Sequence, residues 1–229
     1  MFWFSDFLNL FYPYVCAACG NGLFAGEQII CTHCLFHLPK TRFHELEGNP
    51  VEKQFWGKVA IHSATALYYF HKGERVQHLI HRLKYKGDTE VGTFTGNLLG
   101  YDLAAAGRFR GITHVAPVPL HPAKKRLRGY NQSDFFAEGL AQVLKVPFLP
   151  DLLVRTTKTD SQTRKSRYSR YENMKSVFGV NPRFQLSDCH ILLVDDVITT
   201  GSTLAECASV LLTMPGASVS IATIAYARM

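Results

Sequence analysis

Apolar residues follow two different spacings along this chain, and each spacing predicts a type of element. Short continuous runs, such as 191–194 and 218–227, have the length and β-branched content of buried parallel strands. Between residues 74 and 86 the apolar positions instead recur at intervals of three and four, which is typical of an amphipathic helix. Strands therefore alternate with helices, which predicts an α/β fold. Further helices are predicted over 91–106, from Ser133 or Asp134 to Leu144, and over 204–212.

The remaining segments are less regular. Residues 59–71 are predicted as a hairpin or two short strands, and 113–120 as a strand whose prolines prevent it from continuing as a central one. Short strands are also predicted over 152–156 and 175–180. A polar stretch over 39–57, rich in turn-forming residues, is predicted to hold the domain boundary. We therefore expect an N-terminal module over 1–40, a linker over 41–57 and a main domain over 58–229.

The most informative pattern is the run ILLVDDVITTGST over 191–203. An apolar strand leads into Asp195 and Asp196, and a hydroxyl-rich turn over 199–203 then opens a helix. A helix N-terminus at the carboxyl edge of a sheet is a site for anions, and the glycine lets the backbone approach a phosphate closely. Carboxylates next to an anion site indicate a ligand that also carries hydroxyls or a metal, and a phosphorylated sugar fits. Two other interpretations remain: the magnesium-binding half of a P-loop nucleotidase, although its glycine-rich motif is absent upstream, and an ordinary strand, turn and capped helix.

The charge is concentrated in two segments. The formal net charge is +7, and residues 121–130 carry four cations without an acid, while 155–175 carries seven cations and two acids. The second segment has no apolar periodicity, which in a compact domain is typical of a functional or disordered loop. A local basic excess of this kind favours a polyanion site over a generally adhesive surface. The alternative is a solvated basic loop.

Four of the six cysteines lie near the N-terminus in two C-x-x-C pairs: Cys16, Cys19, Cys31 and Cys34. This spacing predicts a structural Zn²⁺ site, because about thirty residues are too few to form a core of their own. Disulfides or a redox pair are the alternatives. His33 and His37 could replace a ligand, but the four thiols are sufficient. The remaining Cys189 and Cys207 are predicted to be inert core residues.

Residues 1–14, MFWFSDFLNLFYPY, are aromatic but lack the basic start of a signal peptide. We predict a short amphipathic helix that packs on the body, with an interfacial membrane anchor as the alternative. No apolar run approaches the ~20 residues of a membrane span. We therefore expect a cytoplasmic protein.

The run over 191–203 resembles the 5-phosphoribosyl-1-pyrophosphate (PRPP) signature of the type I phosphoribosyltransferases. The string APVPL over 116–120, the later RGYNQ and the KYKG around Tyr85 are similar, together with the cysteine pairs, to the ComF-like proteins associated with DNA uptake in competence. The motifs occur in the order of that family. The resemblance implies a phosphoribosyltransferase-like parallel sheet flanked by helices, with a small zinc-finger module at the N-terminus.

The resemblance also implies roles for particular residues. Asp195 and Asp196 would hold the ribose hydroxyls of magnesium-bound PRPP. The segment over 157–171 corresponds to a mobile loop that closes over the substrates in the family. The phosphates would bind to Thr199, Thr200, Gly201, Ser202, Thr203, Lys124, Arg126 and Arg128. The closing loop would contribute Gln162, Arg164, Arg167 and Arg170, with Arg164 and Arg167 in a catalytic role, while Tyr130, Arg167, Tyr168, Arg170 and Tyr171 would meet nucleic acid.

Two classes of function follow. In the first, the chain is a ComF-like competence protein that binds Mg²⁺-PRPP and handles incoming single-stranded DNA. In the second, it is an active phosphoribosyltransferase that transfers the sugar to a nucleobase or another nitrogen acceptor, without a DNA role. The zinc module would either dock proteins of the competence machinery or only support the main domain. The sequence leaves the acceptor open.

Overall fold

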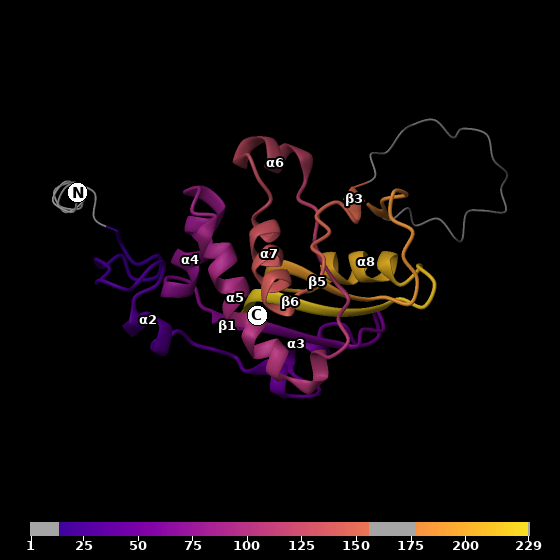
Figure 1. The fold of residues 1–229 in the computed structure, drawn as a ribbon, viewed down its shortest axis with the longest axis horizontal. Coiled ribbons are helices and arrows are strands. Elements are labelled where there is room, and N and C mark those ends of the chain that lie inside the picture. Colours follow the sequence, from indigo (N-terminus) through magenta and orange to yellow (C-terminus); the bar gives the residue numbers. More distant parts are fainter. Residues whose placement is uncertain (1–13, 156–176, 229) are drawn as a thin grey trace.

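The fold is built on a four-stranded parallel sheet with the strand order β1-β6-β5-β2 (Figure 1). The structure is a computed structural model that describes residues 14–155 and 177–228. A separate antiparallel pair, β3 and β4, lies apart from this sheet. The strands are β1 (Ser63–Phe70), β2 (His114–Pro117), β3 (Leu153–Arg155), β4 (Phe178–Val180), β5 (His190–Ile198) and β6 (Ser218–Ala227).

The central strands β5 and β6 are buried on both faces, as their continuous apolar runs predict. Successive side chains of a strand point to opposite faces. Leu192 and Val194 accordingly join one hydrophobic cluster, whereas Ile191 and Leu193 join the other. Strand β2 pairs with β5 and is the last named strand at this edge of the sheet, where Pro117 ends it, and its outer side forms one isolated bridge between Val115 and Phe148.

Helices cover both faces of the sheet. Helices α4, α5 and α7 contribute their apolar residues to the first cluster, which also contains the cysteine module, and α3 and α8 contribute to the second. Helix α6 projects at one margin of the molecule, and the cysteine module lies next to α4, at the opposite end from α8 and β3 (Figure 1). The α-helices are α2 (Thr32–His37), α3 (Pro50–Lys53), α4 (Arg75–Tyr85), α5 (Glu90–Ala105), α6 (Pro122–Arg128), α7 (Gln132–Leu144) and α8 (Ser202–Leu211), and the 3-10 helices are η1 (Phe43–Glu45) and η2 (Gly107–Phe109).

Helices α5 and α7 pack at unusually short range because glycines lie at their contact. A Cβ atom on Gly96 would lie 2.3 Å from the carbonyl oxygen of Phe136, and one on Gly139 would lie 2.3 Å from that of Thr93. Any larger residue at either position would force the helices apart. This contact helps to fix α7, whose first turn lies at the end of β5.

Three local predictions are wrong in detail. Residues 59–71 form the single strand β1, not a hairpin, because Ser63–Phe70 pairs continuously with β6. Helix α7 begins at Gln132 after Asn131, so neither Ser133 nor Asp134 is its cap. The basic segment after β2 is not an extended loop, since Pro122 starts the short helix α6 and His121 caps it by accepting a hydrogen bond from the backbone N–H of Ala123.

The stretch predicted as a linker is folded against the main body. It contains η1 and α3, and Phe43, Val51 and Phe55 are buried in the second cluster. Asn49 caps α3 and also donates to the carbonyl oxygen of Ala64, at the start of β1. This stretch therefore reaches the underside of the loop that follows β5.

Candidate functional site

The candidate site lies at the carboxyl end of β5, where Asp195 and Asp196 are held by side chains from two helices. Asp195 is partly buried and Asp196 is only 4% exposed. The hydroxyl of Ser133 donates to Oδ1 of Asp195 at 2.9 Å, and Nε2 of Gln132 donates to Oδ2 of Asp196 at 2.5 Å. Both donors come from the first turn of α7. The two carboxylates therefore have fixed orientations before any ligand arrives.

The positive charge next to the carboxylates comes from α4. Nζ of Lys84 lies 2.8 Å from Oδ1 of Asp196, and both side chains are largely buried. Together with Gln132, Lys84 gives each oxygen of Asp196 a partner. A ligand that binds Asp196 must either share these oxygens or displace Lys84.

Burial and the adjacent charge of Asp196 raise the pKa of Asp195 well above its ordinary value. The backbone N–H of Asp196, the Ser133 hydroxyl and the Lys84 ammonium act in the opposite direction and do not outweigh them. The Asp195 carboxyl is therefore harder to ionise than a free one, and a cation or a hydroxyl donor next to it would favour its charged form.

The loop after β5 has an open helix N-terminus. Gly201 adopts a left-handed conformation with φ of 71° and precedes α8 without a side-chain cap. The hydroxyls of Thr200 and Ser202 lie 3.0 Å apart, and Thr199, Thr200, Ser202 and Thr203 are exposed. Nζ of Lys58 donates to the carbonyl oxygen of Thr200 at 3.0 Å, which secures the loop from the α3 side. Hydroxyls and the first turn of α8 are thus available to an anion.

Helix α6 carries the predicted cations Lys124, Arg126 and Arg128 on its surface. Arg128 donates to Oε1 of Gln132, which itself donates to Asp196, so α6 is connected to the carboxylate pair through one amide side chain. The Arg128 guanidinium also lies over the ring of Tyr85, 5.3 Å from its centroid.

A pocket of about 310 Å³ opens between the end of α4 and α6. Tyr85 is 65% exposed and Leu127 is 90% exposed, so this pocket offers apolar surface among cations. No acid lies among the described residues that line it. Its lining consists of Lys84, Tyr85, Gly87, Lys124, Leu127, Arg128 and Tyr130.

The four N-terminal cysteines form a separate cluster. Their Sγ atoms all lie within 4.8 Å of one another, and Cys16 and Cys34 are fully buried. The Sγ atoms of Cys19 and Cys31 are 3.8 Å apart, which is close to the sulfur–sulfur distance of about 3.8 Å in a tetrahedral site with zinc–sulfur bonds of about 2.3 Å. The donor set therefore fits a structural zinc ion.

The electrostatics of this cluster also favour a metal. Burial opposes ionisation of Cys16, but backbone N–H groups of Cys31, Cys19 and Ala18 outweigh it and lower the pKa of Cys16 to about 7. Burial raises the pKa of Cys34 strongly, so the four thiols do not all ionise without a cation. His33 and His37 are exposed and stacked on each other, outside the cluster.

The structure brings some of the predicted site residues together and leaves others outside its description. Asp195, Asp196 and the loop 199–203 lie in one strand–turn–helix unit, and of the α6 cations Arg128 is linked to it through Gln132. Tyr130 is partly buried, and its hydroxyl donates to the carbonyl oxygen of Leu83. The predicted residues that lie outside the described chain are Gln162, Arg164, Arg167, Tyr168, Arg170 and Tyr171.

Sequence reasoning missed the direct partners of the carboxylates, which are Lys84, Gln132 and Ser133. Lys84 lies in the KYKG string and Gln132 in the RGYNQ string, but neither string indicates a contact with the aspartates, and Ser133 is predicted only as a helix cap. No spacing rule connects α4 or α7 to β5, because the contact is made only by the packing of the two helices on the sheet.

Comparison with known proteins agrees with this architecture. Residues 132–229 match the family described as phosphoribosyl transferase domain. This part of the chain is therefore similar to phosphoribosyl transferase domains. The match begins at the first turn of α7 and includes both aspartates and the loop 199–203, so the predicted fold class is confirmed by the parallel sheet and by this family.

Relatives extend the similarity over most of the chain. DNA utilization protein YhgH of Escherichia coli strain K12 is 28% identical over 211 residues, which cover 90% of this chain and 88% of that protein. Competence protein F of Haemophilus influenzae is 29% identical over 205 residues, which cover 87% of this chain and 79% of that protein. The resemblance to the ComF-like proteins is therefore confirmed.

Among solved structures, an adenine phosphoribosyltransferase from Thermoanaerobacter pseudethanolicus is 17% identical to this chain. The similarity covers 62% of this chain and 83% of that one, with a TM-score of 0.39. Within the described chain, no helix has both the length and the apolar character needed to cross a bilayer.

Proposed function

We propose that this protein binds Mg²⁺-PRPP at the carboxyl end of β5 and acts in the uptake or use of DNA. One observation carries the proposal: Asp195, Asp196 and the hydroxyl-rich loop lie in one strand–turn–helix unit, within the residues that match the phosphoribosyl transferase family. The names of the relatives, DNA utilization protein and competence protein F, supply the biological setting.

The ribose would bind to the carboxylate pair. Carboxylates accept hydrogen bonds from two adjacent hydroxyls, and Ser133 and Gln132 hold Asp195 and Asp196 in place for them. Mg²⁺ that arrives with PRPP would supply positive charge next to Asp195 and Asp196 and would reduce the repulsion between the two carboxylates. Lys84 would then be free to leave Asp196 and meet the pyrophosphate.

The phosphates would bind on either side of the ribose. The 5′-phosphate fits the loop 199–203, where hydroxyls and the N-terminus of α8 offer donors. The pyrophosphate would bind to Lys124, Arg126 and Arg128 of α6. We assign to Arg164 and Arg167, which lie outside the described residues, the role of covering the bound pyrophosphate with further positive charge. This arrangement would stabilise the negative charge that develops on departing pyrophosphate.

If an acceptor is bound, the same site would transfer the phosphoribosyl group to a nitrogen. The C1–pyrophosphate bond would break, a C1–nitrogen bond would form, and magnesium pyrophosphate would leave with the electron pair of the broken bond. No activated nucleophile is needed, since positioning and electrostatics lower the barrier. A screen of nucleobases for pyrophosphate release distinguishes this transferase from a protein that only binds PRPP.

The binding proposal is tested by titration calorimetry with Mg²⁺-PRPP. Asp195→Asn combined with Asp196→Asn is expected to abolish binding while the far-ultraviolet circular dichroism stays unchanged. Thr203→Ala in the loop is expected to weaken binding about tenfold, because it removes a donor to a phosphate. Thr213→Ala, at the other end of α8, is the matched control and should bind normally. Full affinity in the double variant would refute the assignment.

The pocket between α4 and α6 favours a second role, the binding of single-stranded DNA. An exposed Tyr85 ring and the exposed Leu127 side chain lie among Lys84, Lys124 and Arg128, and this combination suits stacked bases and a phosphate backbone. The alternative is that the same cations serve PRPP alone.

Fluorescence anisotropy with a labelled single strand tests this role. Tyr85→Ala is expected to weaken binding about tenfold through the loss of stacking. Tyr101→Ala is the matched control, since Tyr101 on α5 is 67% exposed and lies outside the pocket. Replacement of Lys124 should reduce the slope of affinity against salt. Absence of binding at low salt would end the DNA proposal and leave the PRPP proposal intact.

A further inference from the structure

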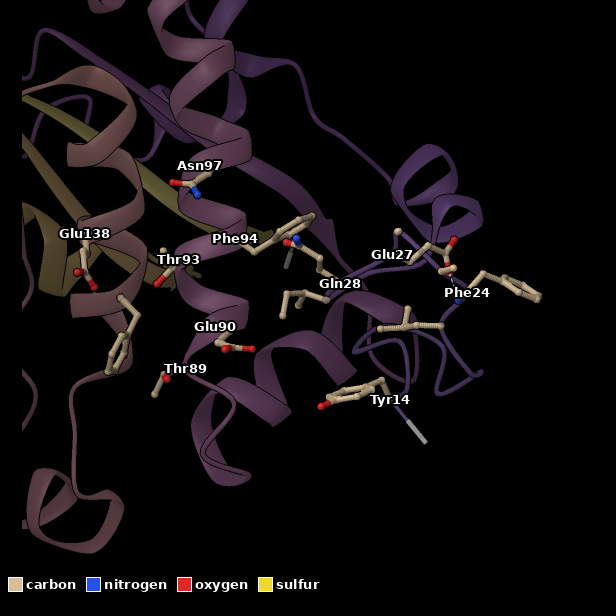
Figure 2. Close-up of a pocket in the computed structure, with 15 residues that line it drawn as sticks. Tyr14, Phe24, Glu27, Gln28, Thr89, Glu90, Thr93, Phe94, Asn97 and Glu138 are labelled. Atoms are coloured by element: carbon tan, nitrogen blue, oxygen red, sulfur yellow. Dashed lines mark hydrogen bonds between the residues drawn. The ribbon is translucent and has the colours of Figure 1, made fainter. Parts of the chain in front are cut away.

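A groove lined by the cysteine module, α5 and α7 shares none of its residues with the proposed site. It has a volume of about 910 Å³ and lies between the cysteine module and the two helices (Figure 2). We call it the module groove and define it by Leu23, Phe24, Ile29, Phe94, Phe135 and Glu138, with Tyr14 at its rim. The groove therefore joins parts of the chain that are far apart in sequence.

The walls of the module groove are mostly apolar and incompletely covered. Leu23, Ile29 and Phe94 pack partly against the first hydrophobic cluster, so they form the floor. Phe24 is 80% exposed and Tyr14 is 74% exposed, and both rings lie at the groove without apolar cover (Figure 2). The side-chain oxygen of Asn97 in the lining is buried and has no hydrogen-bond partner within the described chain. The apolar floor and the uncovered rings indicate an apolar occupant.

The sequence provides an occupant that is tethered to this groove. Residues 1–13 precede Tyr14 directly, so wherever they lie they depart from the rim. Nine of these 13 residues are apolar, six of the nine are aromatic, and Asp6 is the one charged side chain. Helical spacing would place Ser5, Asp6 and Asn9 on one face and would leave an apolar face opposite. That apolar face consists of Trp3, Phe4, Phe7, Leu8 and Phe11.

We propose that residues 1–13 fold back into the module groove and cover it. The short tether gives the segment a high effective concentration at its own groove, which favours this contact over a free partner. Docking removes two apolar surfaces from water at once, the aromatic segment and the rings of Tyr14 and Phe24. The segment thereby clamps the cysteine module to α5 and α7, and the module becomes part of the main body.

Trp3 is a native reporter for this contact. The chain has two tryptophans, and Trp56 is 65% exposed, so Trp56→Phe leaves Trp3 as the sole emitter in the full-length protein. We expect its emission to be blue-shifted and shielded from acrylamide. In that background, Phe24→Ser should shift the balance towards the undocked segment about tenfold, with red-shifted emission and stronger quenching.

Phe36→Ser is the matched control. Phe36 lies in the same module and is 79% exposed, but it does not line the groove, so its replacement should leave Trp3 emission unchanged. Zinc content and circular dichroism establish that each variant is folded. Tyr14→Ser repeats the test at the rim of the groove, with Tyr101→Ser as its control.

Four results would overturn the proposal. The first is solvent-exposed Trp3 emission in the parent protein. The second is a blue shift that appears only with anionic phospholipid vesicles, which would make the segment an interfacial anchor. The third is a blue shift that depends on protein concentration, which would indicate a second copy as the partner. The fourth is an equal response to Phe24→Ser and Phe36→Ser, which would place the segment elsewhere.

Discussion

The cluster of four cysteine thiols and the pair of aspartate carboxyls are assembled in different ways. The four thiols come from residues 16–34, one pair at a turn over 17–19 and the other at the N-terminus of α2, so nearly all of their geometry is local. Asp195 and Asp196 are neighbours in the chain, but their partners Gln132 and Lys84 come from other helices. Local spacing therefore explains the first cluster, whereas only the packing of α4 and α7 on the sheet explains the second.

The clusters also differ in the source of their neutralising charge. Lys84 provides a cation for Asp196 from within the protein. The cysteines form a donor set that fits zinc, and burial holds the pKa of Cys34 high in the absence of a cation. We therefore expect the cysteine site to need an external metal ion, whereas the carboxylate site already holds the Lys84 ammonium, which a ligand would have to share or displace.

The largest expected effect concerns the metal. We expect one zinc per chain and loss of the module's fold on chelation, because structural zinc contributes on the order of 10 kcal/mol to such sites. Hydrogen exchange should then lose protection over residues 14–38 and keep it in β5. Elemental analysis with Cys34→Ala should find no bound zinc.

Cys207→Ala is the control for this experiment, because Cys207 is also fully buried but lies in α8 outside the cluster. It should retain one zinc. Retention of zinc by Cys34→Ala, or unchanged protection after chelation, would contradict the distinction between the two clusters.

A smaller effect is expected from Lys84→Met, which leaves the buried charge of Asp196 without its cation. Breaking such a pair should cost about 3 kcal/mol in the free energy of unfolding, measured with urea. Adding Asp196→Asn should recover much of that loss. Lys124→Met, at an exposed cation that forms no ion pair within the described residues, should cost less than about 0.5 kcal/mol. Equal losses for the two lysines would mean that Lys84 does not neutralise the site.

The smallest effect is a pH-dependent gain in stability from Asp195→Asn. Folding raises the pKa of Asp195 above its unfolded pKa of about 4. The protonated carboxyl therefore stabilises the fold fully below that unfolded pKa, and this stabilisation disappears as pH rises through the pKa of the folded protein. The free energy of unfolding of the Asn variant should therefore rise relative to that of the parent between about pH 5 and about pH 8. The difference should reach about 1–2 kcal/mol.

Urea unfolding across this pH range measures the gain, with the exposed Asp151→Asn as control. A difference that stays constant with pH, or one that shrinks as pH rises, would show that Asp195 carries no electrostatic cost. In either case the ligand-binding role of Asp195 would be tested separately by calorimetry.

The sequence by itself determined the features whose causes are local. The apolar run of β5, the two aspartates at its end and the glycine of the following turn lie within thirteen residues, and the cysteine pairs follow a metal-binding spacing. These features were sufficient to predict the α/β fold, the thiol cluster and the position of the loop before α8.

Only the tertiary structure decided which distant side chains meet. Lys84 reaches Asp196 because α4 packs across the sheet, and Gln132 and Ser133 reach the carboxylates because the glycines of α5 and α7 allow close helix contact. The same packing folds the predicted linker under the loop and opens the module groove. Periodicity in the sequence shows which face of an element is apolar, but not which other element that face will contact. Which elements contact one another depends on the packing of the whole chain.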